Sequence, residues 1–538
     1  MNAGREAGEA SLGVERASRT SDQSEVTGMA LKARMPSRRE FLAVSAHTGL
    51  GALAVSVGLP RREGLAQPAG SGVREIQLEA RELTWELAPG KVIKAMAYNG
   101  RVPGPEIRVK EGERVRIVLK NGLAEPTTIH WHGVDVPNAM DGVPEVTQKA
   151  VSPGETFAYE FEARPAGTRW YHTHFQEHRQ LDLGLAAPLI IEPARPDPFP
   201  VDREYTLVLD DWATGTSQPV PSTREGIAGG RGATGGMMGG MGGMMGGGMG
   251  GMMEGMMGRG GMGSMMGGGQ MPAYDTMTIN GKASPATEPL RVRKGERIRL
   301  RLINASADHT HVVRLAGHRL RVTHTDGNPL VQPVEVDAVP IAPSERYDVM
   351  VVADRPGAWV FTCLAPGHRA AGEQVLLIYE GHEGAKAEAP NEGVAGLDLW
   401  QYGLGRGRDV LPRPSGPERV YDLALSGGMM GSDVWTINGK QYPRTDPLRL
   451  RRGDLARVRF VNHSMEGHPM HLHGQSFKVL AVNGARYAQP IVKDSVDVEP
   501  HMGSVVLEFT AHNPGDWFFH CHKPMHMEGG MITLARIA

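Results

Sequence analysis

The chain reads Gly295-Glu296-Arg297-Ile298-Arg299-Leu300-Arg301-Leu302-Ile303-Asn304, and Thr278-Ile279-Asn280-Gly281 stands a short way before it. Asn-Gly is the strongest short signal for a hairpin turn. The alternation of apolar and polar residues in the longer run is typical of a half-buried β-strand. The segment therefore predicts a half-buried strand that follows a tight turn.

Near-copies of this segment occur on both sides of it. The first has Asn99-Gly100 followed by residues 112–121, and the third has Asn438-Gly439 followed by residues 453–462. Long helical periodicity is absent between the copies, and many short alternating runs are punctuated by Gly and Pro. This pattern predicts an all-β chain of three tandem Greek-key β-sandwiches.

The boundaries between the three sandwiches follow from composition. Seams are expected near Glu192 to Asp202 and in the Gly/Pro-rich stretch from Gly381 to Pro417. We therefore expect domains at residues 67–197, 198–385 and 386–538, the last beginning with a linker at 386–417.

One segment of the second domain, residues 226–271, departs from the pattern: 23 of its 46 residues are glycine and 14 are methionine. Glycine brings no side chain to a core and has maximal chain entropy. A mobile insertion is expected there.

The N-terminal region reads as an export signal. Ser37-Arg38-Arg39-Glu40-Phe41-Leu42 precedes a moderately apolar run and then Gly64-Leu65-Ala66, the pattern of a twin-arginine signal with a small-residue cleavage site. We expect residues 1–66 to be removed and the protein to work in the periplasm or outside the cell. A membrane anchor is the alternative, but the apolar run is short and Gly-rich for a bilayer, so no stable membrane insertion is expected.

Composition limits the partners. Lys and Arg number 58 against 60 Asp and Glu, so bulk charge gives no reason to expect a nucleic acid. The only cysteines, Cys363 and Cys521, are far apart, which argues against a disulfide framework. Small or neutral partners and a monomer are expected.

Four histidine-rich clusters carry the chemistry. They are His130-Trp131-His132, His172-Thr173-His174, His468-Pro469-Met470-His471-Leu472-His473 and His520-Cys521-His522-Lys523-Pro524-Met525-His526, with Met531 five residues beyond. Residues i and i+2 of a strand share a face, so each His-x-His pair presents two imidazoles side by side. Four such pairs can converge on one site.

The last cluster adds a second kind of site. A thiolate with two imidazoles and a weak axial thioether is the blue-copper arrangement, and His468, Cys521, His526 and Met531 supply that set. The strand pleat directs the Cys521 thiolate to one face and both flanking histidines to the other. A closed zinc site would need only four ligands and would leave most of these residues unexplained.

The four clusters resemble the copper-binding motifs of the three-domain multicopper oxidases, the laccase and bacterial cuprous oxidase family. The resemblance implies three cupredoxin domains and four copper ions. It assigns the type 1 copper to His468, Cys521, His526 and Met531, and the type 2 copper to His130 and His471. It assigns the type 3 pair to His132, His172 and His522 on one ion and His174, His473 and His520 on the other.

The same resemblance implies the reaction. A substrate gives single electrons to the type 1 copper, they cross through Cys521 to His520 or His522, and O₂ is reduced to water. Asp141 matches an acidic residue that family members place after the first motif, where it would supply protons; a surface salt bridge is the alternative. Many bacterial relatives carry Glu directly after the last type 1 histidine, where this chain has Met527 followed by Glu528. We do not expect Glu528 to take over that role.

The second copy of the repeat keeps part of a copper site. Alignment of the second and third copies sets His311, Cys363 and His368 opposite His468, Cys521 and His526, with Glu373 at the axial position and Thr362 and Leu364 beside the cysteine. A relic of domain duplication is the favoured interpretation, because the first copy has decayed to Thr127 and Thr173 with only His178 left. The alternative is a fifth copper at His311, Cys363 and His368.

Thioethers suggest the substrate. Thioether sulfur favours Cu(I), and the insertion offers many thioethers. Met465 and Glu466, just before His468, are candidates to acquire Cu(I) and pass it to the type 1 copper, and ordinary loop residues are the alternative. We expect O₂ as the oxidant and Cu(I) as the favoured substrate, with small phenols oxidised as well. A phenol-oxidising laccase whose insertion is a spacer and a copper-sequestering protein remain as alternatives, whereas a copper nitrite reductase lacks the eight-histidine set.

Overall fold

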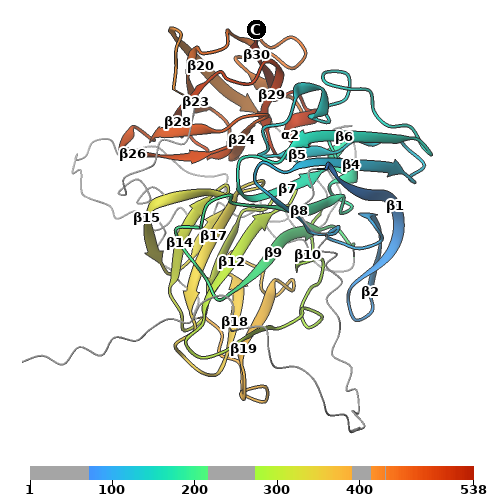
Figure 1. Cartoon of the computed structure of the whole chain (residues 1–538), viewed down its shortest axis with the longest axis vertical. Helices are drawn as coiled ribbons and strands as arrows, with labels where there is room; N and C mark the ends of the chain where they lie inside the picture. Colours follow the sequence, from blue (N-terminus) through green and yellow to red (C-terminus); the bar gives the residue numbers. More distant parts are fainter. Residues whose placement is uncertain (1–71, 216–272, 391–412, 430–431) are drawn as a thin grey trace, which may run out of the picture. The chain divides into compact units, whose positions relative to one another are not determined.

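The structure is a computed structural model that describes residues 72–215, 273–390, 413–429 and 432–538. The expected export signal, the Gly/Met insertion and residues 391–412 of the expected linker lie outside the described residues. Ala69–Ala538 forms one compact unit. In the described residues the strands form six sheets, two for each copy of the repeat, and Figure 1 shows the three pairs in blue to green, green to golden orange, and dark orange to red.

The first domain contains two four-stranded sheets. One has the order β2-β1-β4-β6 and the other β3-β8-β7-β5. The strands are β1 (Arg74–Ala88), β2 (Lys91–Tyr98), β3 (Ile107–Lys110), β4 (Arg114–Asn121), β5 (His130–His132), β6 (Thr156–Glu162), β7 (Gly167–His172) and β8 (Ala186–Glu192). Two short helical turns accompany them, η1 (Asn138–Met140) and α1 (Glu177–Gln180).

The second domain contains a six-stranded sheet, β10-β9-β12-β17-β14-β15, and a five-stranded sheet, β11-β19-β18-β13-β16. The strands are β9 (Arg203–Trp212), β10 (Thr276–Ile279), β11 (Leu290–Val292), β12 (Arg297–Asn304), β13 (His311–Leu315), β14 (Leu320–Thr325), β15 (Asn328–Val336), β16 (Val339–Ile341), β17 (Arg346–Val352), β18 (Ala358–Cys363) and β19 (Gln374–Tyr379).

The third domain repeats this topology strand for strand. Its sheets are β21-β20-β23-β28-β25-β26 and β22-β30-β29-β24-β27. The elements are β20 (Glu418–Gly427), β21 (Trp435–Ile437), β22 (Leu448–Leu450), β23 (Leu455–Asn462), β24 (His468–Leu472), β25 (Phe477–Val482), β26 (Ala485–Lys493), β27 (Ser495–Val498), β28 (Ser504–Thr510), β29 (Gly515–Cys521), α2 (Pro524–Glu528) and β30 (Ile532–Ile537). The predicted all-β fold of three related sandwiches is confirmed.

The three Asn-Gly dipeptides form the predicted turns. Asn99, Asn280 and Asn438 have φ of 51°, 54° and 52°, and the glycines after them have φ of 70°, 70° and 71°. Two successive residues at positive φ make a type I′ turn, whose twist matches that of the flanking strands. The repeat therefore has the same turn at the same place in each domain.

The alternating strands β4, β12 and β23 are interior strands of the sheets β2-β1-β4-β6, β10-β9-β12-β17-β14-β15 and β21-β20-β23-β28-β25-β26. β4 and β23 alternate in burial, as predicted, but β12 is buried on both faces. The expectation of a half-buried strand is wrong for β12, because its polar face is covered. Arg301 on that face donates hydrogen bonds to Asp348 at 3.0 Å and to Thr168 of the first domain at 2.8 Å.

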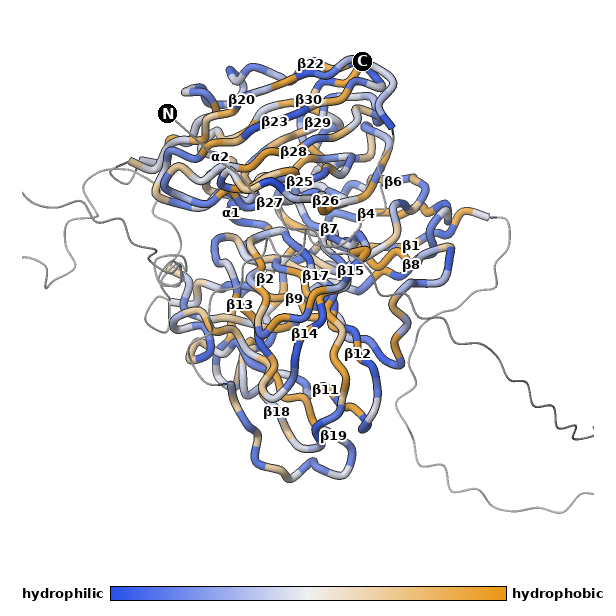
Figure 2. Tube along the Cα trace, turned by 90° about the vertical axis from the view of Figure 1, so that its left-hand side faces the viewer, coloured by the Kyte–Doolittle hydropathy of each residue, from blue (hydrophilic) through white to orange (hydrophobic). Residues whose placement is uncertain are grey.

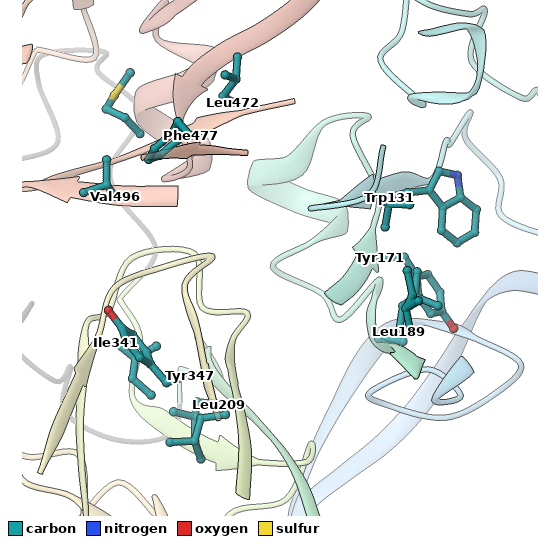
Figure 3. Packing of buried hydrophobic residues seen from close by; sticks show 14 of the residues in the cluster. Trp131, Tyr171, Leu189, Leu209, Ile341, Tyr347, Leu472, Phe477 and Val496 are labelled. Carbon is teal, nitrogen blue, oxygen red and sulfur yellow. The ribbon is translucent and has the colours of Figure 1, made fainter. Parts of the chain in front are cut away.

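Each sandwich encloses apolar side chains from both of its sheets. Figure 3 shows part of this packing, with Trp131, Tyr171 and Leu189 from the first domain, Leu209, Ile341 and Tyr347 from the second, and Leu472, Phe477 and Val496 from the third. Hydrophilic (blue) and hydrophobic (orange) residues alternate along many of the strands in Figure 2. None of the helices in the described ranges is long and apolar enough to cross a membrane.

Candidate metal centre

Three strand ends and a short helix bring His468, Cys521, His526 and Met531 together. β24 begins at His468 and pairs with β29, which ends at Cys521, so that Met470 lies opposite Cys521. Pro524 begins the short helix α2, where its fixed φ and missing N–H suit the first turn, and this helix carries His526. The Met531 amide then donates to the His526 carbonyl at 3.0 Å.

The side chains converge at this point. Cys521 Sγ lies 3.6 Å from His468 Nδ1 and 3.5 Å from His526 Nδ1, and the two nitrogens are 3.1 Å apart. These three residues and Met531 are at most 1% exposed. Burial raises the pKa of the Cys521 thiol, so a metal must displace its proton to bind the sulfur.

Neighbouring groups orient the two imidazoles. His468 Nε2 lies 2.7 Å from Ser464 Oγ, and the indole of Trp435 packs on the His526 ring with centroids 3.7 Å apart. Glu466 Oε2 lies 3.2 Å from His526 Nε2, although the Glu466 side chain is 40% exposed. Glu466 therefore connects the surface to a candidate copper ligand.

Eight further histidines form a second, larger cluster from both ends of the chain. Strand pairing sets His130 opposite His172 in the first domain and His471 opposite His520 in the third. All eight are buried; they are His130, His132, His172, His174, His471, His473, His520 and His522. The structure therefore brings together every histidine of the four His-x-His pairs.

Ligand atoms of the predicted sets lie close together, although His130 also groups with His132 and His172 and with His471 and His473. His130 Nε2 lies 3.4 Å from His471 Nε2, the predicted type 2 pair. His174, His473 and His520 have ligand atoms within 4.8 Å of one another. The rings of His132, His172 and His522 lie 5.0 to 5.8 Å apart.

The chemistry of this cluster fits a group of metal ions. Burial lowers the pKa of seven of the eight imidazoles, namely His132, His172, His174, His471, His473, His520 and His522. They are thus neutral bases, the form that coordinates a metal. Nε2 of His172, His174 and His522 is buried and, among the described residues, has no hydrogen-bond partner. A bound ion is one explanation for buried polar atoms without a partner, and imidazole suits copper.

Asp141 contacts two of these histidines. Its Oδ2 accepts a hydrogen bond from His473 Nδ1 at 2.8 Å, its Oδ1 lies 3.2 Å from His130 Nδ1, and it is 0% exposed. The alternative of a surface salt bridge is therefore wrong. Asp141 holds both rings so that their Nε2 atoms face the cluster.

Asp494 has a comparable place that the sequence did not suggest. Its Oδ1 lies 3.1 Å from His132 Nε2, and its main-chain oxygen lies 2.8 Å from His471 Nδ1. Arg346 of the second domain donates to both of its carboxylate oxygens at 2.6 Å, and Arg169 of the first approaches at 3.4 Å. A fully buried ion-pair network thus joins all three domains beside the histidine cluster.

Glu177 was also missed. Its Oε1 lies 3.2 Å from His174 Nδ1, and it is 0% exposed. Burial, with a smaller contribution from Glu528, holds the pKa of Glu177 well above its usual range. The adjacent sequence motif ends at His174, so only the helical turn α1 reveals this contact.

Glu528 lies at the surface, and its proposed lack of a proton-relay role stays a prediction. It is exposed and forms an ion pair with His178 of the first domain. The geometric reason differs from strand alternation, because residues 524–528 are helical. His178 is therefore paired at the surface, whereas Thr127 and Thr173 donate hydrogen bonds to Gln180.

The remaining predicted residues are placed as follows. His311, Cys363 and His368 are buried and, with Glu373, have ligand atoms within 4.8 Å of one another. Met465 is 77% exposed.

Comparison with known proteins agrees with this geometry. Three multicopper oxidase family models match residues 79–196, 254–380 and 416–537. Multicopper oxidase MmcO of Mycobacterium tuberculosis is 32% identical over 94% of this chain and 98% of its own length. A copper resistance protein A homolog of Pseudomonas syringae pv. tomato is 28% identical over 88% of this chain and 93% of its own.

Among solved structures, a multi-copper oxidase from Pseudomonas thermotolerans superposes with a TM-score of 0.63 at 25% identity, covering 87% of this chain and 100% of that one. The family models, a relative that matches over nearly its whole length, and the convergence of the histidine clusters lead to one conclusion. The chain belongs to the multicopper oxidases, copper enzymes that oxidise a substrate and reduce O₂.

Proposed function

We propose that the enzyme is exported and oxidises Cu(I), with small phenols as secondary substrates. In this proposal His468, Cys521, His526 and Met531 hold the type 1 copper, and the eight histidines hold one type 2 and two type 3 ions. Bound copper supplies one-electron transfer from the substrate and the four-electron reduction of O₂ to water.

The observation that carries the substrate proposal is the surface above His526. Glu466 is partly exposed yet lies 3.2 Å from His526 Nε2. A hydrogen bond with His526 lowers the pKa of Glu466 to about 2, against the effect of burial and with the help of the Lys523 charge. Glu466 is thus an anion at the surface, next to the residues proposed to receive the electron.

Three exposed methionines lie in segments that lead into this region. Met465 and Met502 are 77% and 61% exposed, and the Met502 amide donates to the Asn462 carbonyl in the loop that carries Met465. Met429 is also 77% exposed, and it lies six residues before Trp435, which packs on His526. Thioether sulfur is a soft ligand that favours Cu(I), so these methionines and Glu466 are the groups we propose to receive Cu(I).

In this proposal, individual residues have separate roles in electron transfer and proton supply. Cys521 is the covalent connection between the two centres, because His520 and His522 flank it and join the histidine cluster. Asp141 accepts a hydrogen bond from His473 Nδ1 and, in our proposal, passes protons toward the site of O₂ reduction. Burial of the eight histidines, each at most 5% exposed, limits access of bulk water to that site.

Two alternative functions predict different experimental results. A phenol-oxidising laccase would need neither the exposed thioethers nor residues 226–271. A copper-sequestering protein would confer copper tolerance without turnover. The similarity to copper resistance proteins favours a role in copper tolerance, and the complete set of predicted ligands favours turnover over storage.

Steady-state O₂ uptake tests the proposal with Cu(I) and with a phenol on the same preparations. The Met465→Leu/Met502→Leu variant keeps apolar volume and removes the sulfur, and Val420→Leu, at a 63% exposed position, is the matched control. We expect kcat/KM for Cu(I) to fall about tenfold, equivalent to roughly 1.4 kcal/mol, while phenol turnover is unchanged. Equal effects on both substrates, or none, would contradict the proposal.

Deletion of residues 226–271 is a second arm of this experiment. It should impair Cu(I) turnover at low copper concentration and leave phenol turnover intact. Copper tolerance that persists after Cys521→Ser would instead favour sequestration.

A further inference from the structure

A second set of potential copper ligands lies in the middle domain. His311 begins β13, Cys363 ends β18, and His368 and Glu373 lie in the connection to β19. None of the four is more than 1% exposed. Their ligand atoms lie within 4.8 Å of one another.

In this middle-domain set, the same kinds of ligand atom face inward as in the proposed type 1 site of the third domain. His311 Nδ1 and His368 Nδ1 lie 2.8 Å and 2.9 Å from Glu373 Oε2, so both Nδ1 atoms point inward. The two rings have centroids 5.1 Å apart at 76°, against 4.9 Å and 62° for His468 and His526. The second site thus has the ring arrangement of the first.

The surroundings are repeated as well. His311 Nε2 lies 2.7 Å from Ser306 Oγ, the same distance as from His468 Nε2 to Ser464 Oγ. The Cys363 sulfur accepts hydrogen bonds from the amides of Val312 at 3.1 Å and Ala365 at 3.3 Å. Amides directed at sulfur are a feature of copper–thiolate sites.

The first domain shows what a decayed site looks like in this chain. Thr127 Oγ1 and Thr173 Oγ1 lie 3.3 Å apart, and both donate to Gln180 Oε1 at 2.8 and 2.9 Å. A hydrogen-bonded network of neutral side chains has filled the former ligand positions. No such replacement has occurred at His311, Cys363 and His368.

Charge explains the role of Glu373. A thiolate, a carboxylate and two neutral imidazoles carry two negative charges, which a divalent ion cancels. The type 1 set of the third domain has methionine in place of the carboxylate and carries only one. Burying a net charge is strongly unfavourable, so the middle-domain set favours a divalent ion and Cu(II) over Cu(I).

We propose that His311, Cys363, His368 and Glu373 bind a fifth copper ion, held as Cu(II). Copper is preferred to zinc because an N/O/S site binds Cu²⁺ more tightly than other divalent first-row ions. The duplication has therefore left a working metal site in the middle domain and not a relic. Thr362 and Leu364, in place of the flanking histidines, leave this ion without the direct covalent link that Cys521 provides.

The chain has only two cysteines, which makes a decisive spectroscopic test possible. In Cys521→Ser, any thiolate-to-Cu(II) charge-transfer absorption must come from Cys363. We expect oxidised, copper-loaded Cys521→Ser to keep such a band and the Cys521→Ser/Cys363→Ser double variant to lose it. Metal analysis should give five copper ions per wild-type chain and four per chain of Cys363→Ser.

Glu373→Met in the Cys521→Ser background is the complementary test, since it retains the thiolate and both histidines. It should change the charge-transfer spectrum and raise the reduction midpoint of that copper, because the ligand set loses one negative charge. His368→Asn replaces Cys363→Ser if the latter fails to fold.

Three results would overturn the proposal: no thiolate–copper absorption in Cys521→Ser, one zinc per chain at this site, or a spectrum unchanged by Glu373→Met. None of these readouts depends on oxidase activity or on the substrate proposed above.

Discussion

Asp494→Asn tests whether the ion-pair network beside the histidine cluster holds the three domains together. The substitution keeps the shape of the side chain and removes the charge that faces Arg346, which is 0% exposed. Breaking a buried pair by neutralising one partner typically destabilises a protein by about 3–5 kcal/mol. The lower end applies here, because Arg346 keeps the Ser344 carbonyl at 3.1 Å and the Asp326 carboxylate at 3.7 Å.

This energy converts to a small but measurable shift in melting temperature. The unfolding entropy is about 2.1 cal/mol/K per residue, so a unit of roughly 470 residues has about 1 kcal/mol/K. A loss of about 3 kcal/mol then lowers the Tm of the copper-loaded enzyme by about 3 °C. Because proteins of this size often unfold irreversibly, wild type and variant are scanned at one fixed rate.

Asp516→Asn is the matched control. Asp516 pairs with Arg536 at 3.3 Å, and both side chains are at least 40% exposed. Exposed pairs contribute between zero and about 1 kcal/mol, so its Tm should fall by less than about 1 °C. If Asp494→Asn lowers the Tm no more than this control, the network does not carry the stability assigned to it.

Three further predictions follow from single features of the structure. Gly142→Ala should lower the Tm and the copper content. Gly142 has a φ of 81°, and an added Cβ would lie 1.9 Å from the Ile129 carbonyl oxygen, so the backbone beside Asp141 must shift. The control variant Gly112→Ala, at a φ of 83° with free space around it, should cost only about 1 kcal/mol of backbone strain. Burial lowers the pKa of His324 to about 4, so its neutral form stabilises the fold above pH 6.5 and this stabilisation is lost as pH falls toward 4. The wild type should therefore lose about 2 kcal/mol more than His324→Gln between pH 6.5 and pH 4.5, as measured by denaturant unfolding, and equal losses would count against it. Removal of copper with a chelator should lower the Tm, and readdition of copper should restore it, because an ion that binds only the folded state stabilises that state. An unchanged Tm would show that the ions are not bound at the buried ligands.

Local motifs account for what the sequence could predict. Asn-Gly turns, alternating strands and His-x-His pairs each lie within a few residues, and together they determine the fold class and the two groups of candidate ligands. The Asp494–Arg346 contact joins residues 148 positions apart. Neither residue belongs to a motif, so nothing in the neighbouring sequence indicates the contact.

Packing between domains explains the other differences. β12 has an alternating sequence, yet Thr168 of another domain helps to cover its polar face. Glu177 belongs to a one-turn helix that is too short to give a periodic signal. Such features depend on which surfaces meet in three dimensions, and the order of residues within one strand does not determine this.

Because the histidine cluster is divided between the two ends of the chain, it can be completed only late in synthesis and folding. Half of its imidazoles are synthesised within the first 174 residues and the other half after residue 470. A nascent chain therefore has no complete oxygen-reducing centre until its last strands have been made and have docked on the first domain. Full copper loading would therefore report that the whole polypeptide has folded, because a chain truncated before β29 lacks His520, Cys521 and His522.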